Sequence, residues 1–589
     1  MGEKVINVKW WELFKPIEGF QVGEGLSNKL AIEREVVPII FAPGIMGSRM
    51  KNKNGDKVWD PDHAWFMVKK YGLLTVKAKD RKALLIGASF DKDFLQVSND
   101  DAKHNEKFAD KDDTGRAQRG WGGVSWNSYG PFLDVLQQRD FGLEWGEPVR
   151  HCFEFPVHAC GYNWTASNRD SGAALAKTID EVIKKYQDLG RICEQVILVT
   201  HSMGGLDARS ACKLHGADSK VLGVIHGVQP ALGSAAAYWR MKGGFDRPGD
   251  APKGEGGVWS FLCNPLKTVK RKPLGTVGAW VLGTDGEEVT SLLGNMPGGL
   301  ELLPNHLYTN NEGKKAWLEF PSADGLSVQA LPKSDPYEEI YLAKDVFYRL
   351  INPTWLDPGI PETQNSNSVI DAVDSWDLYE QYLSLAKQFH ADLQTKAHPQ
   401  TYQFYSEGLN TADRIVYRRH PHDWKNKAKR LLEIIKADFP GRAVSSAVTA
   451  PLLGFNPITF VVKGVVVAAI KDTDMMVNRG GFRCYVNEHD LDTPKDSDAA
   501  LFVMETEMPP NNPVTLGRLQ AGSGGDATVP VSSAAIVPAL ETVGVNKDDE
   551  SYLVRDHEPI YKTKTAQGIT FTAIENLGRL KIRQKIGKT

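Results

Sequence analysis

The feature that most constrains this chain is a serine placed between a buried-looking strand and a helix-like run. A β-branched segment at 195–199 leads through Thr-His-Ser-Met-Gly-Gly at 200–205 into a helical pattern at 206–211. The two glycines that end the motif let a sharp turn close without a Cβ clash. Ser202 is therefore expected to project from the end of a strand, and the helix N-terminus behind it favours negative charge.

Size and composition describe an ordinary globular protein. A chain of 589 residues is too long for one simple core and should hold one large decorated domain or two domains. Hydrophobic residues make up 41% and charged residues 24% of the chain, which is typical of soluble proteins. The net charge is −3, and no Lys/Arg-rich run compensates for it locally. Nucleic acid is therefore not an expected partner.

The N-terminus and the cysteines indicate where the chain is made. Residues 1–11 lack the apolar core of a secretory signal, so synthesis in the cytoplasm without such a signal is expected. Six cysteines are scattered along the sequence without Cys-x-x-Cys spacing. This pattern favours free thiols and argues against a zinc site.

Strand and helix patterns alternate through the first half of the chain. Ser171 to Tyr186 is an amphipathic helix with its apolar residues on one stripe. Strands are expected on either side of that helix, and the alternation predicts an α/β protein with a parallel sheet and helices on both faces. The expected strands are 36–41, 152–157, 195–199, 221–225 and 401–405, and a further helix is expected over 129–138.

The alternation stops twice, and these breaks define the predicted organisation. Residues 237–398 are rich in Gly, Pro and Trp and show no strand–helix rhythm, and residues 423–512 interrupt the pattern again. The predicted units are an N-terminal extension (1–35), a first half of the core (36–236), a cap or lid insertion (237–398), a core strand segment (399–422), a second insertion with apolar helices (423–512) and a second half of the core (513–589).

The stretch from 443 to 470 is the most apolar part of the chain. A transmembrane helix needs about 20 mostly apolar residues, but this stretch contains Pro451, Gly454, Pro457 and Lys463. Two shorter apolar helices, buried or facing lipid, fit this pattern better than one membrane span.

Two downstream motifs supply the groups that an activated serine requires, namely a base and a carboxylate that orients it. Gly522 to Pro530 is a glycine-dense turn that presents one acid, Asp526. Arg555 to Ile560 places His557 before an expected terminal helix.

Four passages together carry a resemblance to a known family. They are Phe-Ala-Pro-Gly-Ile-Met-Gly-Ser at 41–48, Gly-Tyr-Asn-Trp at 161–164, the motif at 200–209 and Gly-Asp-Ala-Thr-Val-Pro at 525–530. In order and spacing the chain resembles α/β-hydrolase lipases of the lecithin:cholesterol acyltransferase and GPI-inositol-deacylase kind. The resemblance implies an α/β-hydrolase fold, a mostly parallel sheet with helices on both faces and large cap or lid insertions. One departure is Thr200, which stands where that family most often has glycine and should crowd the packing of strand on helix.

The resemblance also implies the roles of three residues, in the chain order Ser, Asp, His. Ser202 would be the nucleophile, Asp526 the acid and His557 the base. The alternative for Asp526 is an ordinary turn aspartate. His489 precedes the acid and breaks the order, residues 420–422 lie in a basic stretch, and His557 is the only histidine after Asp526.

The family pattern takes its oxyanion donors from two backbone N–H groups. Here they would belong to Met203, directly after the nucleophile, and Ile45, directly after Pro-Gly in the first loop. Two rival serines, Ser48 and Ser234, do not stand at a strand-to-helix glycine turn and are rejected as the nucleophile.

Other polar and aromatic residues have less certain roles. Trp164 and His201 either touch substrate or brace the turn that carries Ser202, and bracing is favoured. Glu301, Asp472 and Asp474 could bind calcium, but hydrated surface carboxylates are commoner and no loop has EF-hand spacing. No metal and no cofactor is expected.

The resemblance implies a serine lipase or phospholipase that cleaves acyl esters of membrane lipids at a membrane surface. Aromatic residues in 237–398 and the apolar stretch 443–470 suit a lid over a lipid pocket. Without a signal peptide, the chain resembles phospholipase effectors of bacterial type VI secretion, which implies delivery into the periplasm of target cells and a cognate immunity protein. The alternatives are a lipid acyltransferase, a membrane-inserting non-enzymatic toxin and an intracellular lipase or storage esterase.

Overall fold

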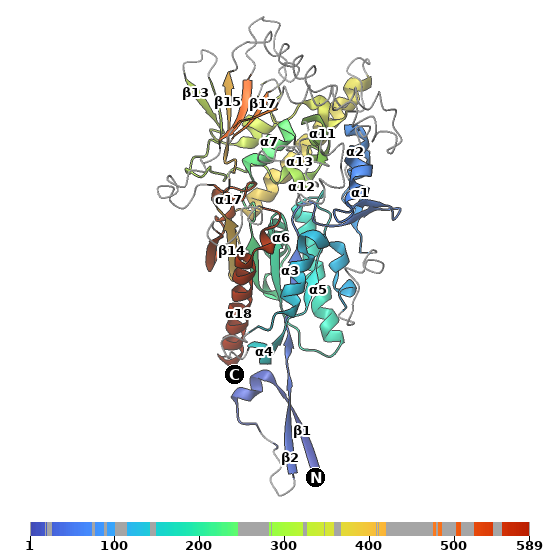
Figure 1. Cartoon of the computed structure of the whole chain (residues 1–589), viewed down its shortest axis with the longest axis vertical. Helices are drawn as coiled ribbons and strands as arrows, with labels where there is room; N and C mark the ends of the chain where they lie inside the picture. The colour runs from blue at the N-terminus through green and yellow to red at the C-terminus, as the bar shows by residue number, and fades with distance from the viewer. Residues whose placement is uncertain are drawn as a thin grey trace, which may run out of the picture.

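The computed structural model of the chain has three parts stacked along its long axis (Figure 1). A narrow N-terminal arm lies at one end, an α/β core in the middle, and a cap of helices and a second sheet at the other end. The structure describes residues 2–17, 19, 26–72, 77–87, 91–99, 115–141, 149–244, 282–283, 286–321, 327–344, 346, 348–358, 367–407, 409, 411–419, 475–478, 481–485, 502–507, 524–545 and 557–587.

The core sheet contains six strands in the order β19-β14-β11-β10-β4-β9. Each neighbouring pair is parallel, as the alternation of strands and helices in the sequence predicts. Because parallel strands end at the same edge, loops from distant parts of the chain meet there. The strands are β4 (Ile39–Ala42), β9 (Val157–Ala159), β10 (Val196–His201), β11 (Val221–Gly227), β14 (Thr401–Ser406) and β19 (Glu541–Val545).

Helices cover both faces of this sheet, and successive strand residues divide between them. Ile40 and Leu198 pack with apolar side chains of α5 (Asn168–Asp188) and α6 (Gly204–Leu214) on one face. Phe41 and Val199 pack on the other face with α3 (Trp126–Gln138) and α18 (Lys564–Gly587). Strands buried on both faces read as continuous apolar runs, which is why 196–199 carries no polar residue.

The cap contains a sheet that local sequence patterns do not reveal. Its order is β13-β12-β15-β18-β17-β16, and its strands come from both insertions and from 399–422. Within that last segment only β14 belongs to the core sheet, because β15 pairs with β12 and β18. The cap strands are β12 (Leu318–Pro321), β13 (Val328–Leu331), β15 (Arg414–Arg419), β16 (Met475–Asn478), β17 (Gly481–Tyr485) and β18 (Phe502–Glu507).

The other described α-helices and strands lie outside the N-terminal arm and the two six-stranded sheets. The remaining helices are α1 (Ala64–Met67), α2 (Ala78–Leu85), α4 (Val149–Cys152), α7 (Ala235–Gly243), α11 (Gly286–Leu293), α12 (Pro297–Leu300), α13 (Asn367–Leu393) and α17 (Val531–Ala534). The remaining strands are β3 (Glu35–Val36), β5 (Met50–Asn52), β6 (Lys57–Trp59), β7 (Leu95–Val97) and β8 (Phe153–Glu154).

The N-terminal extension, which shows no clear period in the sequence, forms a two-stranded ribbon. Strand β1 (Gly2–Lys9) pairs in parallel with β2 (Leu26–Glu33), and the ribbon projects away from the core (Figure 1). Trp10 directly follows β1, is fully buried and packs edge-on against Phe153 at 5.1 Å between ring centroids. This indole fixes the ribbon to the core.

Two expected strands are interrupted in the structure. The expected strand at 36–41 divides into β3 and β4 around Pro38, whose ring removes a backbone donor. The expected strand at 152–157 divides around Pro156 into β8 and β9. The apolar stretch 443–470 lies outside the described residues, so its form stays a prediction. In the part of the chain that the structure describes, no helix is both long and apolar enough to cross a membrane.

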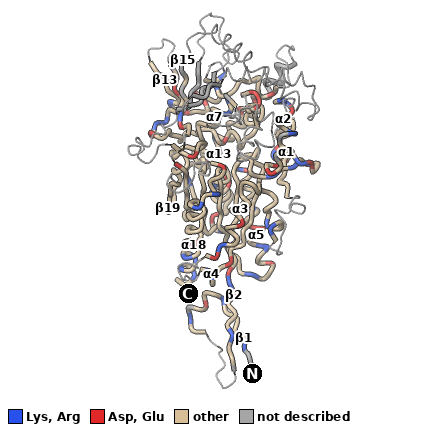
Figure 2. Tube along the Cα trace, viewed as in Figure 1, with Lys and Arg blue, Asp and Glu red and all other residues tan. Residues whose placement is uncertain are grey.

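A buried ion pair ties the terminal helix to the start of the core. Basic residues gather toward the C-terminal end of α18 (Figure 2), and one of them, Lys581, lies 2.8 Å from a carboxylate oxygen of Glu35. The side chains of Lys581 and Glu35 are 2% and 0% exposed. Burial raises the pKa of Glu35, and Lys581 opposes that shift.

We expect Lys581→Met to destabilise the fold strongly, because it leaves the Glu35 carboxylate buried without its cation. The expected loss is about 3–5 kcal/mol in the free energy of unfolding, measured by urea titration. The matched control is Lys585→Met on the same helix, which removes a half-buried ammonium group 2.7 Å from the exposed Glu194 carboxylate and should cost about 0–1 kcal/mol. Equal losses in the two variants would contradict a structural role for the buried pair.

Candidate active site

The turn that carries Ser202 lies at the carboxyl end of β10, directly before α6. Ser202 adopts a φ of 52°, a left-handed conformation that a residue other than glycine adopts only when its surroundings hold it. Its N–H donates to the carbonyl oxygen of Gly227 on the neighbouring strand at 2.9 Å. A Cβ on Gly204 would lie 2.5 Å from the Pro43 carbonyl oxygen, so only glycine fits there.

Thr200 does not produce the crowding that the family comparison suggests. It is fully buried, and its hydroxyl lies 2.9 Å from Nδ1 of His226. Thr200 and His226 are direct partners in the register of β10 and β11. A polar pair between two neighbouring strands therefore accommodates the hydroxyl.

Ser202, His557 and Asp526 form one continuous hydrogen-bonded line, which we call the Ser–His–Asp line. The Ser202 hydroxyl lies 2.7 Å from Nε2 of His557, and Nδ1 of His557 lies 2.5 Å from a carboxylate oxygen of Asp526. Ser202 is 4% exposed, and the His557 side chain is 13% exposed. The structure thus brings together three residues that are distant in the sequence. His557 lies 355 positions after Ser202 and 31 positions after Asp526.

Backbone donors hold the carboxylate of Asp526. Its second oxygen accepts from the N–H groups of Thr528 at 3.0 Å and Val529 at 2.6 Å. Three hydrogen bonds therefore fix the position of this carboxylate. The backbone N–H of His557 also donates to the Asp526 carbonyl oxygen at 3.0 Å, so the acid and the histidine are joined by main chain as well as by side chain.

The turn around Asp526 is also held by Ser234, near the end of the first core half, and by Asn311 of the first insertion. The hydroxyl of Ser234, at the start of α7, donates to the Thr528 carbonyl oxygen at 2.5 Å. Asn311 donates to the Gly524 carbonyl oxygen at 2.9 Å. The insertion therefore braces the acid from the cap side, and Ser234, a rival nucleophile in the sequence, has a helix-capping and bracing role instead.

The loop expected to supply an oxyanion donor lies directly against Ser202. A Cβ on Gly44 would lie 3.0 Å from the Ser202 Cβ, and the Gly47 N–H closes a turn onto the Gly44 carbonyl oxygen at 3.0 Å. Ile45 lies within this turn, and Met203 begins the first turn of α6. Both residues therefore stand beside the serine, where the sequence places them.

A buried chain of hydrogen bonds joins this loop to the histidine. The N–H of Gly44 donates to the Tyr129 hydroxyl oxygen at 3.1 Å, so the Tyr129 hydroxyl proton is directed to Nδ1 of His201 at 2.9 Å. Nε2 of His201 then carries the proton that is donated to the His557 carbonyl oxygen at 2.8 Å. Burial lowers the pKa of His201 to about 3, which keeps this ring neutral.

Trp164 and His201, the two candidates for substrate contact, are both packed in the interior. Trp164 is fully buried and meets Trp59 edge-on at 5.1 Å between ring centroids. The His201 ring is 3% exposed and lies against the rings of Tyr129, His557 and Tyr561. The burial of both candidates supports bracing over substrate contact.

Glu301 is not the hydrated surface carboxylate that the sequence suggests. It is fully buried and accepts from the Ser167 hydroxyl at 2.5 Å and the Asn168 N–H at 2.7 Å, at the start of α5. Burial raises its pKa to about 7. No group of three or more His, Cys, Asp or Glu side chains among the described residues is placed to hold a metal ion, and positions 472 and 474 lie outside those residues.

The other candidate residues and two further tyrosines lie outside the Ser–His–Asp line. The rival Ser48 is buried, and its hydroxyl accepts from the Tyr162 N–H at 2.9 Å. Tyr561 follows the histidine and donates to the Thr200 carbonyl oxygen at 2.8 Å, which ties that segment to the sheet. The histidines at 420, 422 and 489 lie outside the described residues. The position of Tyr561 a few residues after His557 could have suggested its supporting role. Tyr129 lies in an ordinary helical pattern, so nothing in the sequence indicated its role at the site.

One solved structure is similar to this chain over most of its length. No protein family model and no curated protein matches the sequence. A chain of the crystal structure of the Tle4–Tli4 complex is similar over 93% of this chain and 99% of its own length, with a TM-score of 0.60 and 22% identity. Two weaker similarities are Bacillus licheniformis lipase BlEst2 in propeptide form (TM-score 0.16, 20% identity, 35% of this chain and 25% of that one) and phospholipase PlaB from Legionella pneumophila (0.17, 12%, 71% and 90%).

The similarity to the chain of the Tle4–Tli4 structure and the parallel sheet confirm the predicted fold class. The chain has an α/β-hydrolase fold with helices on both faces of the sheet and large insertions. At 22% identity, likeness to the Tle4–Tli4 structure shows the fold alone, and the resemblance to lecithin:cholesterol acyltransferase and GPI-inositol-deacylase stays a prediction.

For the ester cleavage that the sequence predicts, Tyr129→Phe should lower turnover about tenfold to a hundredfold, because the Gly44 N–H and His201 Nδ1 both lose a buried partner. The unfolding free energy should fall by about 1–3 kcal/mol. Steady-state kinetics should show the loss mainly in kcat.

The matched control is Tyr186→Phe, which removes a tyrosine–histidine hydrogen bond of 2.9 Å to His158, at a position outside the Ser–His–Asp line. This control should lose stability and keep kcat. Equal kcat in both variants would show that the Tyr129 chain has no part in positioning the site.

Proposed function

We propose that this protein is a serine carboxylic ester hydrolase, a lipase or phospholipase that cleaves acyl esters of membrane lipids. The observation that carries the proposal is the Ser–His–Asp line at the carboxyl edge of a parallel sheet, with Ser202 2.7 Å from His557. A serine hydroxyl is a weak nucleophile unless a base accepts its proton. Here the base is within hydrogen-bond distance, and a carboxylate fixes its tautomer.

The proposed reaction has two halves. Nε2 of His557 accepts the Ser202 proton as Oγ attacks the ester carbonyl carbon, and the same proton then passes to the departing alcohol. Asp526 holds the Nδ1 proton and stabilises the imidazolium. In the second half, His557 accepts a proton from water as the water oxygen adds to the acyl carbon. His557 then gives this proton to Ser202 Oγ as the carboxylic acid leaves.

Charge on the tetrahedral oxygen requires donors that are already in place. Met203 is the N-cap residue of α6, where the helix dipole favours negative charge. The Ile45 N–H lies in the turn that Gly44 and Gly47 close against Ser202. In the proposal these two groups bind the oxyanion, and each contributes about 3 kcal/mol of barrier lowering.

A lipid substrate is favoured by what covers the serine. Ser202 is 4% exposed, and the apolar cluster that contains Met203 and Leu206 continues into α7, α11 and α13 of the cap. A small soluble ester would not need such a cover. A cap that moves aside at a membrane surface would expose both the serine and an apolar wall, and a membrane surface is therefore part of the proposal.

The proposal also covers how the protein is delivered and which protein inhibits it. The similar chain in the Tle4–Tli4 structure is in complex with another protein, which supports a cognate inhibitory protein for this chain. We include the predicted role as a type VI secretion effector that acts in the periplasm of target cells. Transfer of the acyl group to another alcohol uses the same serine chemistry and differs only in the acceptor.

Exchanging the acid or the base should disable the same step. Asp526→Asn and His557→Ala are each expected to lower kcat by about 10⁴-fold or more, and the double variant should lose little beyond the worse single change, because the three groups act as a unit. The control is Asp218→Asn, an acid 3.9 Å from a different histidine, His398. Near wild-type turnover in either site variant would assign the base or the acid elsewhere.

Ser202→Ala should abolish hydrolysis of phosphatidylethanolamine and phosphatidylglycerol vesicles, with a loss of about 10⁴–10⁶-fold. Mass spectrometry with positionally labelled acyl chains measures the products and shows which ester is cut. The variant should keep the wild-type melting temperature. Continued release of fatty acid would refute the assignment.

Dye release from the same vesicles separates hydrolysis from insertion. We expect no leakage with Ser202→Ala. Leakage at the wild-type rate would mean that membrane damage does not require the serine, as the membrane-inserting toxin hypothesis for 443–470 predicts.

A further inference from the structure

The turn that carries the Ile45 N–H contains a strained residue. Met46 is the third residue of the turn 44–47 and has a φ of 63°. At this position of a turn a left-handed conformation is usual for Gly or Asn, and it costs free energy for a longer side chain. Met46 therefore keeps this conformation only because neighbouring groups hold it.

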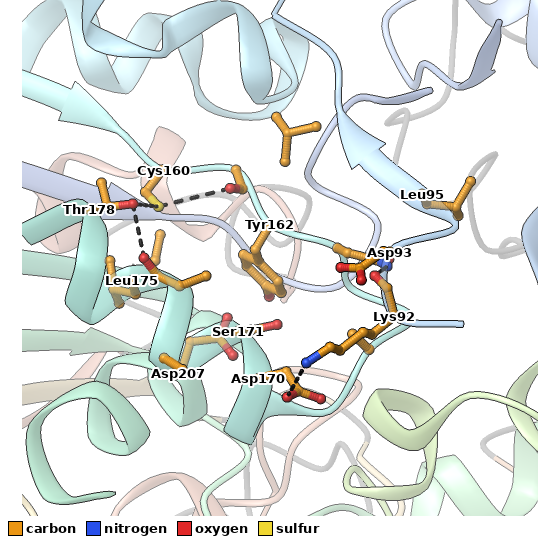
Figure 3. Close-up of a pocket in the computed structure, with 17 residues that line it drawn as sticks. Lys92, Asp93, Leu95, Cys160, Tyr162, Asp170, Ser171, Leu175, Thr178 and Asp207 are labelled. Carbon is orange, nitrogen blue, oxygen red and sulfur yellow. Dashed lines mark hydrogen bonds and ion pairs between the residues drawn. The ribbon is translucent and has the colours of Figure 1, made fainter. Parts of the chain in front are cut away.

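Two tyrosines hold the beginning of this turn. The Gly44 N–H donates to the Tyr129 hydroxyl oxygen at 3.1 Å. One residue earlier, Tyr162, whose ring lines the pocket in Figure 3, donates to the Pro43 carbonyl oxygen at 3.0 Å. Neither bond reaches the middle of the turn, where the strained residue lies.

The indole of Trp59 supplies a contact in the middle of the turn. Its Nε1–H donates to the Met46 carbonyl oxygen at 2.9 Å. The Gly47 N–H, which belongs to the same peptide group, donates to the Gly44 carbonyl oxygen at 3.0 Å. Both polar atoms of this planar peptide group are therefore bonded, which fixes its orientation and the backbone angles on either side of it.

This indole is itself fixed by packing and by a neighbouring ion pair. Trp59 is fully buried and meets Tyr71 and Trp164 at 5.8 and 5.1 Å between ring centroids. The next residue, Asp60, forms a buried ion pair of 2.7 Å with Arg49, which lies two residues after the turn. The end of β6 is thus tied to the chain beside the turn, and the indole can impose a position on it.

The contribution of the Ile45 N–H depends on how the turn is oriented. Among the residues that the structure describes, none accepts a hydrogen bond from this N–H. An oxyanion donor lowers the barrier only when it is already directed at the developing charge, and an error of about 1 Å can cost about a hundredfold in rate. A contact that fixes the turn therefore acts on the rate.

We propose that Trp59 is a positioning residue for ester cleavage. Its N–H holds the Met46 carbonyl and so keeps the turn in the conformation in which the Ile45 N–H can bind the oxyanion. This inference rests on the proposed function, because it assigns a supporting residue to the same site. In this role Trp59 acts through the turn and does not itself contact the reacting atoms.

Trp59→Phe tests the proposal, because it keeps an aromatic ring in the core and removes the indole N–H. With p-nitrophenyl butyrate as the ester, we expect kcat to fall about tenfold to a hundredfold and KM to change less than about threefold. The matched control is Trp121→Phe, another fully buried indole, whose Nε1–H donates to the Val157 carbonyl oxygen at 2.9 Å. This control should lose stability and keep kcat.

Rescue separates positioning from a general loss of stability. Gly adopts a positive φ without a Cβ penalty, so Met46→Gly should keep the turn in place without the indole N–H. The double variant Trp59→Phe/Met46→Gly should therefore recover kcat about tenfold over Trp59→Phe. If Trp59→Phe does not fold, replacement of Trp59 with 3-benzothienylalanine, which has nearly the same shape and lacks the N–H, takes its place in every measurement.

Hydrogen exchange reports on the turn without requiring activity. The peptide that contains residues 44–48 should exchange at least about tenfold faster in Trp59→Phe than in Trp121→Phe or the wild type. An active wild type with equal kcat or equal exchange in the two tryptophan variants, or with no recovery by Met46→Gly, would overturn this inference alone. An inactive wild type would instead refute the proposed function, and unchanged exchange in Trp59→Phe would then refute the hold on the turn as well.

Discussion

The left-handed backbone of Ser202 is the constraint on which the rest of the site depends. This conformation costs about 1–3 kcal/mol for a residue with a Cβ, and it persists because the Gly227 carbonyl accepts the Ser202 N–H and because Gly204 meets the first loop at backbone distance. Both contacts require neighbouring parallel strands to end at the same level. The sheet is therefore what aims the hydroxyl at His557.

Around that turn, main-chain hydrogen bonds as well as side-chain contacts hold the groups of the site. His557 is fixed through its own N–H and C=O as well as through its ring. The Tyr129–His201 chain links the same histidine to the loop of Gly44, so the expected oxyanion donors and the base share one rigid frame. Ser234 at the start of α7 and Asn311 of the first insertion also hold the turn of Asp526. Movement of the cap would therefore shift the turn that positions Asp526.

Local sequence patterns predict the parts of this arrangement that are built locally. The β-branched run before Ser202 and the glycines after it are enough to indicate strand, turn and helix. The pairing of Asp526 with His557 is implied by the family resemblance and not by a local pattern. The cap sheet is different, because β12 pairs with β15, and β15 with β18, each across more than eighty residues. The periodicity of a strand does not indicate which distant strand pairs with it. The same holds for the parallel ribbon of β1 and β2 and for the burial of Glu301, whose partners Ser167 and Asn168 are far away in the sequence.

The central claim is that Ser202 is the activated nucleophile, and site mapping of a covalent probe tests it most directly. Intact protein is treated with a fluorophosphonate, which reacts with serines whose proton a base accepts, and the modified peptide is sequenced by mass spectrometry. The account predicts a single adduct on Ser202, with labelling lost in His557→Ala. An adduct on Ser48, Ser234 or any other serine, or unchanged labelling of Ser202 without His557, would contradict it.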